Sequence, residues 1–186
     1  MTKTSQRKEL LVERLLHGSD PGRPAKDFCI QASLEKLPEF INAKKILLYS
    51  PINGEVDTLK VLKTWIAKKE LYLPRVDKER AIFHVKRLES LEDLVMGKFN
   101  IPEPKKEAPE IDPKGLDLVI VPGVGFDSNG NRIGFGLGYY DRTLKKTSCP
   151  KIGLAYEFQI VDNVPGQSHD VPADIILTEK RIINTM

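Results

Sequence analysis

Apolar and polar residues recur with helical spacing in the N-terminal part of the chain. The pattern predicts one helix over Thr4–His17, which Gly18 ends, and a second from about Ala25 to Leu37. A third helix is predicted over Asp57–Lys69, where four apolar residues share one face, namely Leu59, Leu62, Trp65 and Ile66.

Short apolar runs outside these helices predict β-strands. The runs are Lys45–Ser50, Leu71–Val76, Ala81–Arg87, Leu116–Pro122, Lys151–Tyr156 and Asp174–Thr178. The charged turn at residues 77–80 joins the second and third runs into a predicted hairpin. The segment Ile101–Pro113 holds four prolines in thirteen residues, which favours an extended surface loop.

Strands that alternate with helices predict an α/β fold. We expect a single domain over residues 1–186, Rossmann-like, with three α/β/α layers, a mainly parallel sheet and helices on both faces. Ligands of such folds gather at the carboxyl ends of the strands. The strongest predicted strand, Leu116–Pro122, therefore points to the segment that follows it as a binding loop.

Composition narrows the function classes only modestly. Apolar residues make up 40% of the chain and charged residues 30%, which is typical of a globular protein. The net charge of +3 suits anionic ligands but is too small for a dedicated nucleic-acid binder, so no nucleic-acid partner is expected. Cys29 and Cys149 are isolated, and no apolar run is long enough for a membrane span. We expect a cytoplasmic monomer that binds no membrane.

The glycine-rich segment from Val121 to Asp141 carries the most information. Glycine allows positive φ and lets backbone N–H groups approach an anion, while Arg132 and Asp141 offer a phosphate-type donor and a metal-type acceptor. The segment therefore predicts a cradle for nucleotide phosphates. It matches neither the P-loop nor the dinucleotide fingerprint, and Asn129-Gly130 indicates a turn within it.

Other charged residues permit two interpretations each. Lys3 and Arg7 share one helical face near a helix N-terminus, so they are either a solvated face or a polyphosphate site. Glu55 follows a strand and is either an exposed loop acid or an acceptor for a ligand's N–H groups. Asp141 and Asp170 are either helix caps and ion-pair partners or magnesium ligands. His169 is more readily a surface residue than a base.

Several motifs along the chain together resemble the 5-formyltetrahydrofolate cyclo-ligase family, also called 5,10-methenyltetrahydrofolate synthetase. They are Lys3-x-x-x-Arg7, the Glu55 loop, Leu73-Pro-Arg75, Ile101-Pro-Glu-Pro104, Val121-Pro-Gly-Val-Gly-Phe-Asp127, Arg132-Ile-Gly-x-Gly-x-Gly-Tyr-Tyr-Asp-Arg142, Gly153-Leu-Ala-Tyr156 and His169-Asp170. The resemblance spans nearly the whole chain, so residues 1–186 would form one cyclo-ligase domain.

The resemblance implies a ligase that forms a C–N bond. It would use ATP and Mg²⁺ to close 5-formyltetrahydrofolate into 5,10-methenyltetrahydrofolate, releasing ADP and phosphate. In the family's mechanism the formyl oxygen attacks the γ-phosphoryl group, and N10 then attacks the activated carbon as phosphate leaves. Phosphoryl transfer depends mainly on positioning and charge neutralisation, which agrees with a site rich in glycine and cations.

The resemblance also assigns roles to individual positions. ATP would bind Lys3, Arg7, Arg132, Ile133, Gly134, Phe135, Gly136, Leu137, Gly138, Tyr139 and Tyr140. The folate would contact Ser50, Glu55, Phe135, Gly136, Leu137, Gly138 and Tyr139. Mg²⁺ would be held by Asp141 and Asp170, and the catalytic residues would be Lys3, Arg132 and Tyr139.

Two rival functions remain open at the level of sequence. One is a sugar-phosphate isomerase or coenzyme A transferase relative that uses anion-binding loops without ATP. The other is a folate or RNA binder without catalysis, which would bind without magnesium and, for RNA, with steep salt dependence.

Overall fold

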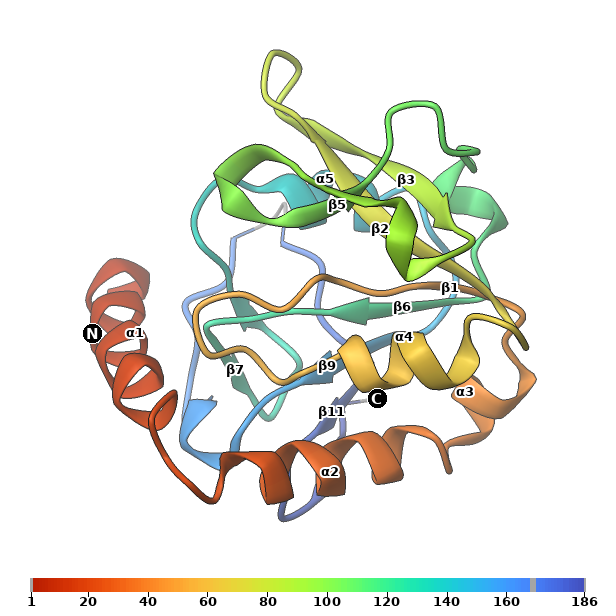
Figure 1. Cartoon of the computed structure of the whole chain (residues 1–186). Coiled ribbons are helices and arrows are strands. Elements are labelled where there is room, and N and C mark those ends of the chain that lie inside the picture. The colour runs from red at the N-terminus through yellow and green to blue at the C-terminus, as the bar shows by residue number, and fades with distance from the viewer. Residues whose placement is uncertain (1, 168–169, 186) are drawn as a thin grey trace.

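A seven-stranded sheet forms the centre of the molecule (Figure 1). The computed structural model describes residues 2–167 and 170–185. The strands lie in the order β12 (Ile182–Asn184), β11 (Ile175–Leu177), β9 (Lys151–Leu154), β6 (Leu118–Val121), β1 (Lys45–Leu47), β2 (Glu70–Asp77) and β3 (Ile82–Leu88). The strands from β11 to β2 are parallel, and β12 and β3 are antiparallel edges. The mainly parallel α/β sheet is therefore confirmed.

Alternate residues of each central strand point to opposite faces of the sheet. In β6, Leu118 and Ile120 enter the core on one face, whereas Val119 and Val121 enter the core on the other. The first face is covered by α2 (Arg23–Leu34), α3 (Pro38–Asn42) and α4 (Leu59–Trp65). The second face is covered by α5 (Tyr139–Leu144) and β7 (Gly125–Asp127). Helices thus lie on both faces, as the α/β/α prediction requires.

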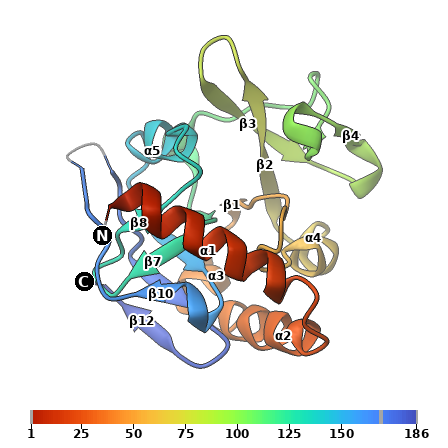
Figure 2. The same ribbon diagram turned by 90° about the vertical axis from the view of Figure 1, so that its left-hand side faces the viewer.

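The N-terminal helix packs on a small second sheet rather than on the main one (Figure 2). This sheet has the order β10 (Ile160–Val161), β7 and β8 (Arg132–Ile133). Leu10 of α1 (Lys3–His17) packs with Val124, Ile133 and Val164. The glycine-rich segment is therefore not one open loop, because its first part forms a β-hairpin beneath α1.

A buried carboxylate organises the turn of that hairpin. Asp127 accepts hydrogen bonds from the backbone of Asn129, Asn131 and Val164 at 2.9–3.0 Å and from the side chain of Asn131. The N–H of Gly130 donates to the carbonyl of Asp127 at 3.0 Å and Gly130 has a φ of +81°, which confirms a turn at Asn129-Gly130.

The second and third predicted helices extend too far along the chain. The second helix ends at Leu34 and not at Leu37, because the extended Leu37 precedes Pro38 and caps α3. The third helix spans only Leu59–Trp65. Asp57 lies outside it, and its side chain accepts a hydrogen bond from the N–H of Leu59 at 2.8 Å. Proline thus limits α2 at its end, and the Asp57 side chain holds the backbone at the start of α4.

The proline-rich segment is not simply a surface loop. β5 (Pro102–Pro104) pairs with β4 (Leu94–Met96), and Glu103 between the two prolines is 1% exposed. The remaining elements are the 3-10 helices Leu91–Asp93, Lys98–Asn100, Pro113–Gly115 and Glu157–Gln159. No helix in residues 2–167 and 170–185 is long and apolar enough to cross a membrane.

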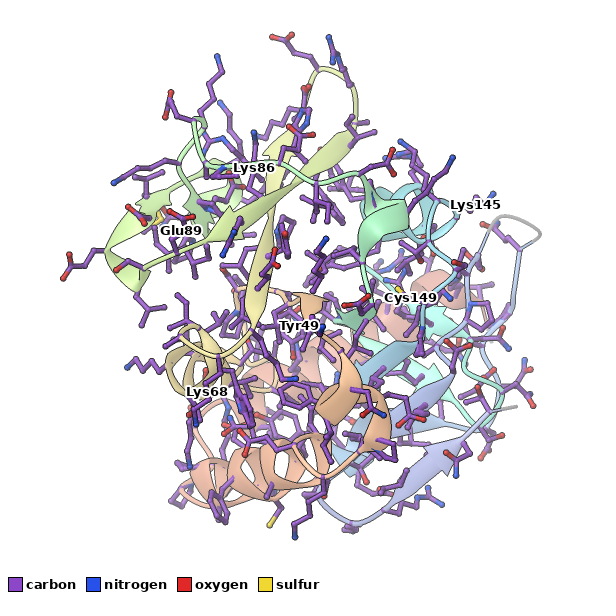
Figure 3. All side chains as sticks on the ribbon, turned by 90° about the vertical axis from the view of Figure 1, so that its right-hand side faces the viewer. Tyr49, Lys68, Lys86, Glu89, Lys145 and Cys149 are labelled. Atoms are coloured by element: carbon purple, nitrogen blue, oxygen red, sulfur yellow. The ribbon has the colours of Figure 1, made fainter. Side chains whose placement is uncertain are left out.

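The order of the strands fixes where a ligand can enter. After β1 the chain moves to β2 on one side, and it later returns to place β6 on the other side of β1. Loops that leave the carboxyl ends of β1 and β6 run apart at this switch point and leave a crevice. Tyr49 follows β1 and lies in the interior, whereas Lys68, Glu89 and Lys145 reach the surface (Figure 3).

Candidate functional site

A cavity of about 500 Å³ opens beyond the carboxyl ends of β1, β2 and β6. Its lining after β1 includes Tyr49, Ser50 and Glu55, and its lining after β6 includes Pro122 and Gly123. The other described residues that line it are Lys3, Arg7, Ile52, Asn53, Pro74, Val76, Phe99, Ile101, Glu103, Arg132, Gly134, Phe135, Gly136, Leu137, Gly138, Tyr139, Tyr140, Asp141, Gln167 and Asp170. The structure thus brings nearly all of the predicted site residues together.

The N-terminal end of α1 supplies two cations to this cavity. The helix begins at Lys3 with a capping box between Thr2 and Ser5. The Nζ of Lys3 lies 2.7 Å from the Oδ2 of Asp170, and the Nε of Arg7 donates to the carbonyl of Gly134 at 2.6 Å. Both side chains are partly buried, so they are not a solvated helix face. The helix N-terminus and its two cations form one electropositive wall.

The second half of the glycine-rich segment lies beside this end of α1 and also lines the cavity. Gly136 and Gly138 have φ values of +94° and +66°, which L side chains rarely adopt. Gly138 is the N-cap of α5, and Arg142 from that helix donates to the carbonyl of Leu137 at 2.6 Å. The positive φ angles let this backbone line the cavity without side chains in the way.

Arg132 and Asp141 form an ion pair at the edge of the cavity. The Nη2 of Arg132 lies 2.8 Å from the Oδ1 of Asp141, and the arginine is 8% exposed. The backbone N–H of Val171 approaches the same Asp141 oxygen at 3.4 Å, which places Asp141 beside the segment of Asp170. The Nε of Arg132 has no hydrogen-bond partner within the described part of the chain.

The two predicted magnesium ligands are thus near neighbours, and each is paired with a cation. Asp141 contacts Arg132, and Asp170 contacts Lys3. Over the described residues no group of three or more His, Cys, Asp or Glu side chains could hold a metal without other ligands. Mg²⁺ commonly takes only one or two carboxylates together with phosphates and water. The donor set therefore fits a magnesium ion that arrives with a nucleotide.

Glu55 is a buried acid, not an exposed one. Its side chain is 4% exposed, and one oxygen accepts from the N–H of Ile52 at 3.0 Å. The other oxygen lies 3.7 Å from Arg14 of α1, and Arg23 of α2 donates to the Glu55 carbonyl at 2.8 Å. Burial raises the pKa of Glu55 to about 7, although Arg14 and the Ile52 N–H oppose this rise. The loop holds an acceptor whose charge changes near neutral pH.

Two more of the predicted site residues, Ser50 and Tyr140, line the cavity, whereas Ile133 does not. The hydroxyl of Ser50 donates to the carbonyl of Pro102 at 2.7 Å, which ties the loop after β1 to β5. The hydroxyl of Tyr140 has no partner in residues 2–167 and 170–185, and burial raises its pKa. The side chain of Ile133 packs in the core under α1 and is not part of the described lining. His169 lies outside the described residues.

Sequence reasoning missed several residues of this site. Tyr49, Glu103 and Gln167 line the cavity, and Arg14 lies beneath it. A signal for Glu103 was present, because it belongs to the Ile101-Pro-Glu-Pro104 motif. A signal for Arg14 was also present, because a residue seven positions after Arg7 lies on the same helical face.

The arrangement is suited to phosphoryl transfer. The glycine segment, three cations and two carboxylates line the same cavity as the buried acid Glu55. Among the described residues, none of the lining side chains is Cys or His. Positioning and charge neutralisation, without a covalent cysteine or histidine intermediate, are what this chemistry requires.

Comparisons with known proteins point to one enzyme family. A model of the 5-formyltetrahydrofolate cyclo-ligase family matches residues 1–179. A 5-formyltetrahydrofolate cyclo-ligase of Haemophilus influenzae is 39% identical over 146 residues, which cover 73% of this chain and 75% of the relative.

Two solved structures share the fold. The NMR structure of Aquifex aeolicus 5,10-methenyltetrahydrofolate synthetase superposes with a TM-score of 0.90 at 38% identity, over 100% of this chain and 93% of that one. A 5,10-methenyltetrahydrofolate synthetase from Mycoplasma pneumoniae superposes with a TM-score of 0.74 at 29% identity, over 100% of both chains. The family resemblance seen in the motifs is confirmed, and the chain belongs to the 5-formyltetrahydrofolate cyclo-ligase family.

Proposed function

We propose that this protein closes 5-formyltetrahydrofolate into 5,10-methenyltetrahydrofolate with ATP and Mg²⁺, releasing ADP and phosphate. The observation that carries the proposal is the joining of two kinds of subsite in one cavity. Lys3, Arg7 and the glycine segment suit a polyphosphate, and Glu55 suits a ligand with N–H donors. The chain belongs to the 5-formyltetrahydrofolate cyclo-ligase family, and the proposed reaction would use both subsites.

ATP would lie along the wall formed by α1 and the glycine segment. Lys3 and Arg132 would neutralise the phosphates, and the glycine N–H groups would donate to them. Asp141 and Asp170 would hold the magnesium ion, which supplies further charge neutralisation when it is bound. Each of these carboxylates would exchange its present cationic partner for the ion.

The folate would lie with its pterin ring towards Glu55. A pterin carries an amino group and a ring N–H, and an ionised carboxylate accepts such a pair of donors strongly. Pro74, Val76 and Ile101 add apolar surface to the lining of the cavity, which suits the pterin ring. Tyr139 also lines the cavity and is proposed to contact both substrates.

The proposed reaction balances in two steps. The formyl oxygen attacks the γ-phosphorus, the bond to the β-phosphate oxygen breaks, and ADP leaves. N10 then attacks the formyl carbon, the carbon–oxygen bond breaks, and phosphate departs with the former formyl oxygen while N10 loses its proton. The chain's task is to align the formyl oxygen with the γ-phosphorus and to neutralise the charge that develops there.

Absorbance at the methenyl-folate band tests the proposal. Purified protein is mixed with 5-formyltetrahydrofolate, Mg²⁺ and ATP, and each component is omitted in turn. A rise that needs all three supports the cyclo-ligase. No rise from protein that circular dichroism shows to be folded would rule out this activity and favour a binding role without catalysis.

A further inference from the structure

Arg14 is a fully buried cation with few partners. Its exposed fraction is 0%, and Nη1 donates to the carbonyl of Gly123 at 3.3 Å. Within the described part of the chain, its Nε and Nη2 have no hydrogen-bond partner. A buried guanidinium with unsatisfied donors destabilises a fold, whereas an apolar side chain of similar length would not. Stability alone therefore does not explain an arginine at this position.

The contacts of Arg14 join three loops of the cavity. Besides Gly123 after β6, its guanidinium lies 3.7 Å from a Glu55 oxygen and 5.2 Å from the centroid of the Phe135 ring. All three of these residues line the cavity, and Arg14 is not in the described lining. It can act on a ligand only through the residues above it.

Arg14 belongs to the same helix as the two cations Lys3 and Arg7. Lys3, Arg7 and Arg14 are spaced by four and seven residues, so they share one helical face. The eleven residues from Lys3 to Arg14 correspond to about 16 Å of helix. One rigid helix thus carries the phosphate-side cations at its start and the partner of Glu55 near its end.

The charged surroundings of Glu55 leave Arg14 as its main counter-ion. Burial raises the pKa of Glu55, and Arg14 is the largest influence that lowers it, ahead of the Ile52 N–H. The other titratable neighbours are the phenols of Tyr49 and Tyr140, whose own pKa values are raised, so both stay neutral. Arg23 of α2 donates to the Glu55 backbone carbonyl at 2.8 Å.

We propose that Arg14 is a positioning residue that keeps Glu55 ionised and oriented for the N–H donors of the folate. The inference rests on the proposed function, since it explains what holds the proposed folate-binding carboxylate in its charge state and orientation. It also makes folate recognition pH-dependent, because a neutral carboxylic acid loses the charge that strengthens both hydrogen bonds.

The first test measures the dissociation constant of 5-formyltetrahydrofolate without ATP from pH 6 to pH 9. Arg14→Met removes the charge but keeps an apolar stem, Arg14→Lys keeps a charge, and Lys8→Met is a matched control on the exposed face of α1. Arg14→Met is expected to weaken binding at pH 7.5 at least threefold, with recovery at higher pH. Arg14→Lys should lose less, and Lys8→Met should match the wild type.

The second test separates an effect through Glu55 from a merely structural one. In a Glu55→Gln background, Arg14→Met should change folate affinity by less than about twofold, because no charge is left to maintain. In steady-state kinetics Arg14→Met should raise KM for the folate far more than KM for ATP. An equal loss of affinity in both backgrounds would overturn the proposal.

The third test needs no substrate. The ¹³C-carboxyl signal of Glu55 is titrated in wild type, Arg14→Met and Arg14→Lys, and the midpoint should rise by at least one pH unit in Arg14→Met. If Arg14→Met does not fold, Arg14→Lys must show a smaller rise in the same direction. Unchanged midpoints would overturn the inference even in an active cyclo-ligase, whereas an inactive wild type with shifted midpoints would overturn the proposed function.

Discussion

Three ion pairs lie in or directly beside the cavity. They are Lys3 with Asp170, Arg132 with Asp141, and Arg14 with Glu55. Each pair holds a charge in a partly or fully buried place, where an unpaired ion is costly. A ligand that carries both phosphates and a metal ion can replace partners in the first two pairs without leaving an uncompensated charge.

Replacing Lys3 tests the phosphate end at the level of one residue. Lys3→Ala is expected to lower kcat/KM for ATP at least tenfold, which is about 1.4 kcal/mol of transition-state stabilisation. The reason is the loss of a cation that lines the cavity at the N-terminus of α1. Lys8→Ala, on the exposed side of the same helix, should behave as the wild type. Wild-type rates in folded Lys3→Ala would contradict the proposed role of Lys3 in ATP binding.

The raised pKa of Glu55 predicts a pH-dependent stability. The carboxyl has a folded pKa of about 7 against an ordinary value of 4.5, so the folded chain binds more protons between these values. The free energy of unfolding therefore falls as pH rises through this window. The full loss of stability from ionising Glu55 is present above pH 7. Glu55→Gln lacks this group, so its stability relative to wild type should increase by about 2 kcal/mol from pH 5 to pH 8.

Urea unfolding at several pH values measures this difference directly. Only the change with pH is predicted, because Glu55→Gln also leaves Arg14 without its counter-ion. Glu13→Gln on the exposed face of α1 is the control and should run parallel to the wild type. Parallel curves for Glu55→Gln as well would contradict the raised pKa.

At the scale of elements, the backbone of the glycine segment shapes the phosphate wall. Gly136 has φ +94°, and a Cβ there would approach the guanidinium of Arg7 at 3.4 Å. Gly136→Ala should lower the free energy of unfolding by about 1 kcal/mol and raise KM for ATP, because alanine strains this conformation. Gly166→Ala is the matched control, since its nearest atom outside the neighbouring residues lies at 3.7 Å and its φ is not positive. Equal KM values in both variants would contradict the proposed role of the segment.

Elements with strong local patterns could be predicted from the sequence. The first helix was predicted within one residue of Lys3–His17, and the buried run around β6 was found because four consecutive residues are fully apolar. β5 was missed because its prolines indicate a loop, and only its pairing with β4 makes it a strand. Local pattern carries no information about such a distant partner.

The same limit applies to the residues of the site. Lys3, Arg7 and the glycine segment could be assigned because they lie in dense motifs. The burial of Arg14 and Glu55 could not, since each is an ordinary charged residue in its local segment, and their exposed fractions of 0% and 4% result from packing between α1, α2 and the loop after β1. Tertiary context, not propensity, decides these positions.

At the scale of the whole molecule, the strand order creates the site. β2 and β6 lie on opposite sides of β1, so loops from distant parts of the sequence meet at one crevice. α1 then covers the small sheet and brings cations from the start of the chain to the same place. The site is therefore assembled only in the complete fold.

Thermal unfolding should report on ligand binding to this assembled site. Mg²⁺ and ATP together, at about 100 times their dissociation constant, should stabilise the protein by about 2.7 kcal/mol and raise Tm by about 5–10 °C. Mg²⁺ alone should shift Tm little, because Arg132 and Lys3 occupy the two carboxylates. In Asp141→Ala the extra shift that Mg²⁺ adds to ATP should largely disappear. If Mg²⁺ alone raised Tm as much as Mg²⁺ with ATP, the two carboxylates would not be held by Lys3 and Arg132.

The most direct measurement follows the formyl oxygen through the reaction. 5-Formyltetrahydrofolate labelled with ¹⁸O in the formyl group is mixed with the protein, Mg²⁺ and ATP, and methenyl absorbance and the mass of released phosphate are recorded together. We predict methenyl product only in the complete mixture, with one ¹⁸O atom in each phosphate released. Methenyl product with unlabelled phosphate would contradict attack by the formyl oxygen, and no product from folded protein would contradict the proposed function itself.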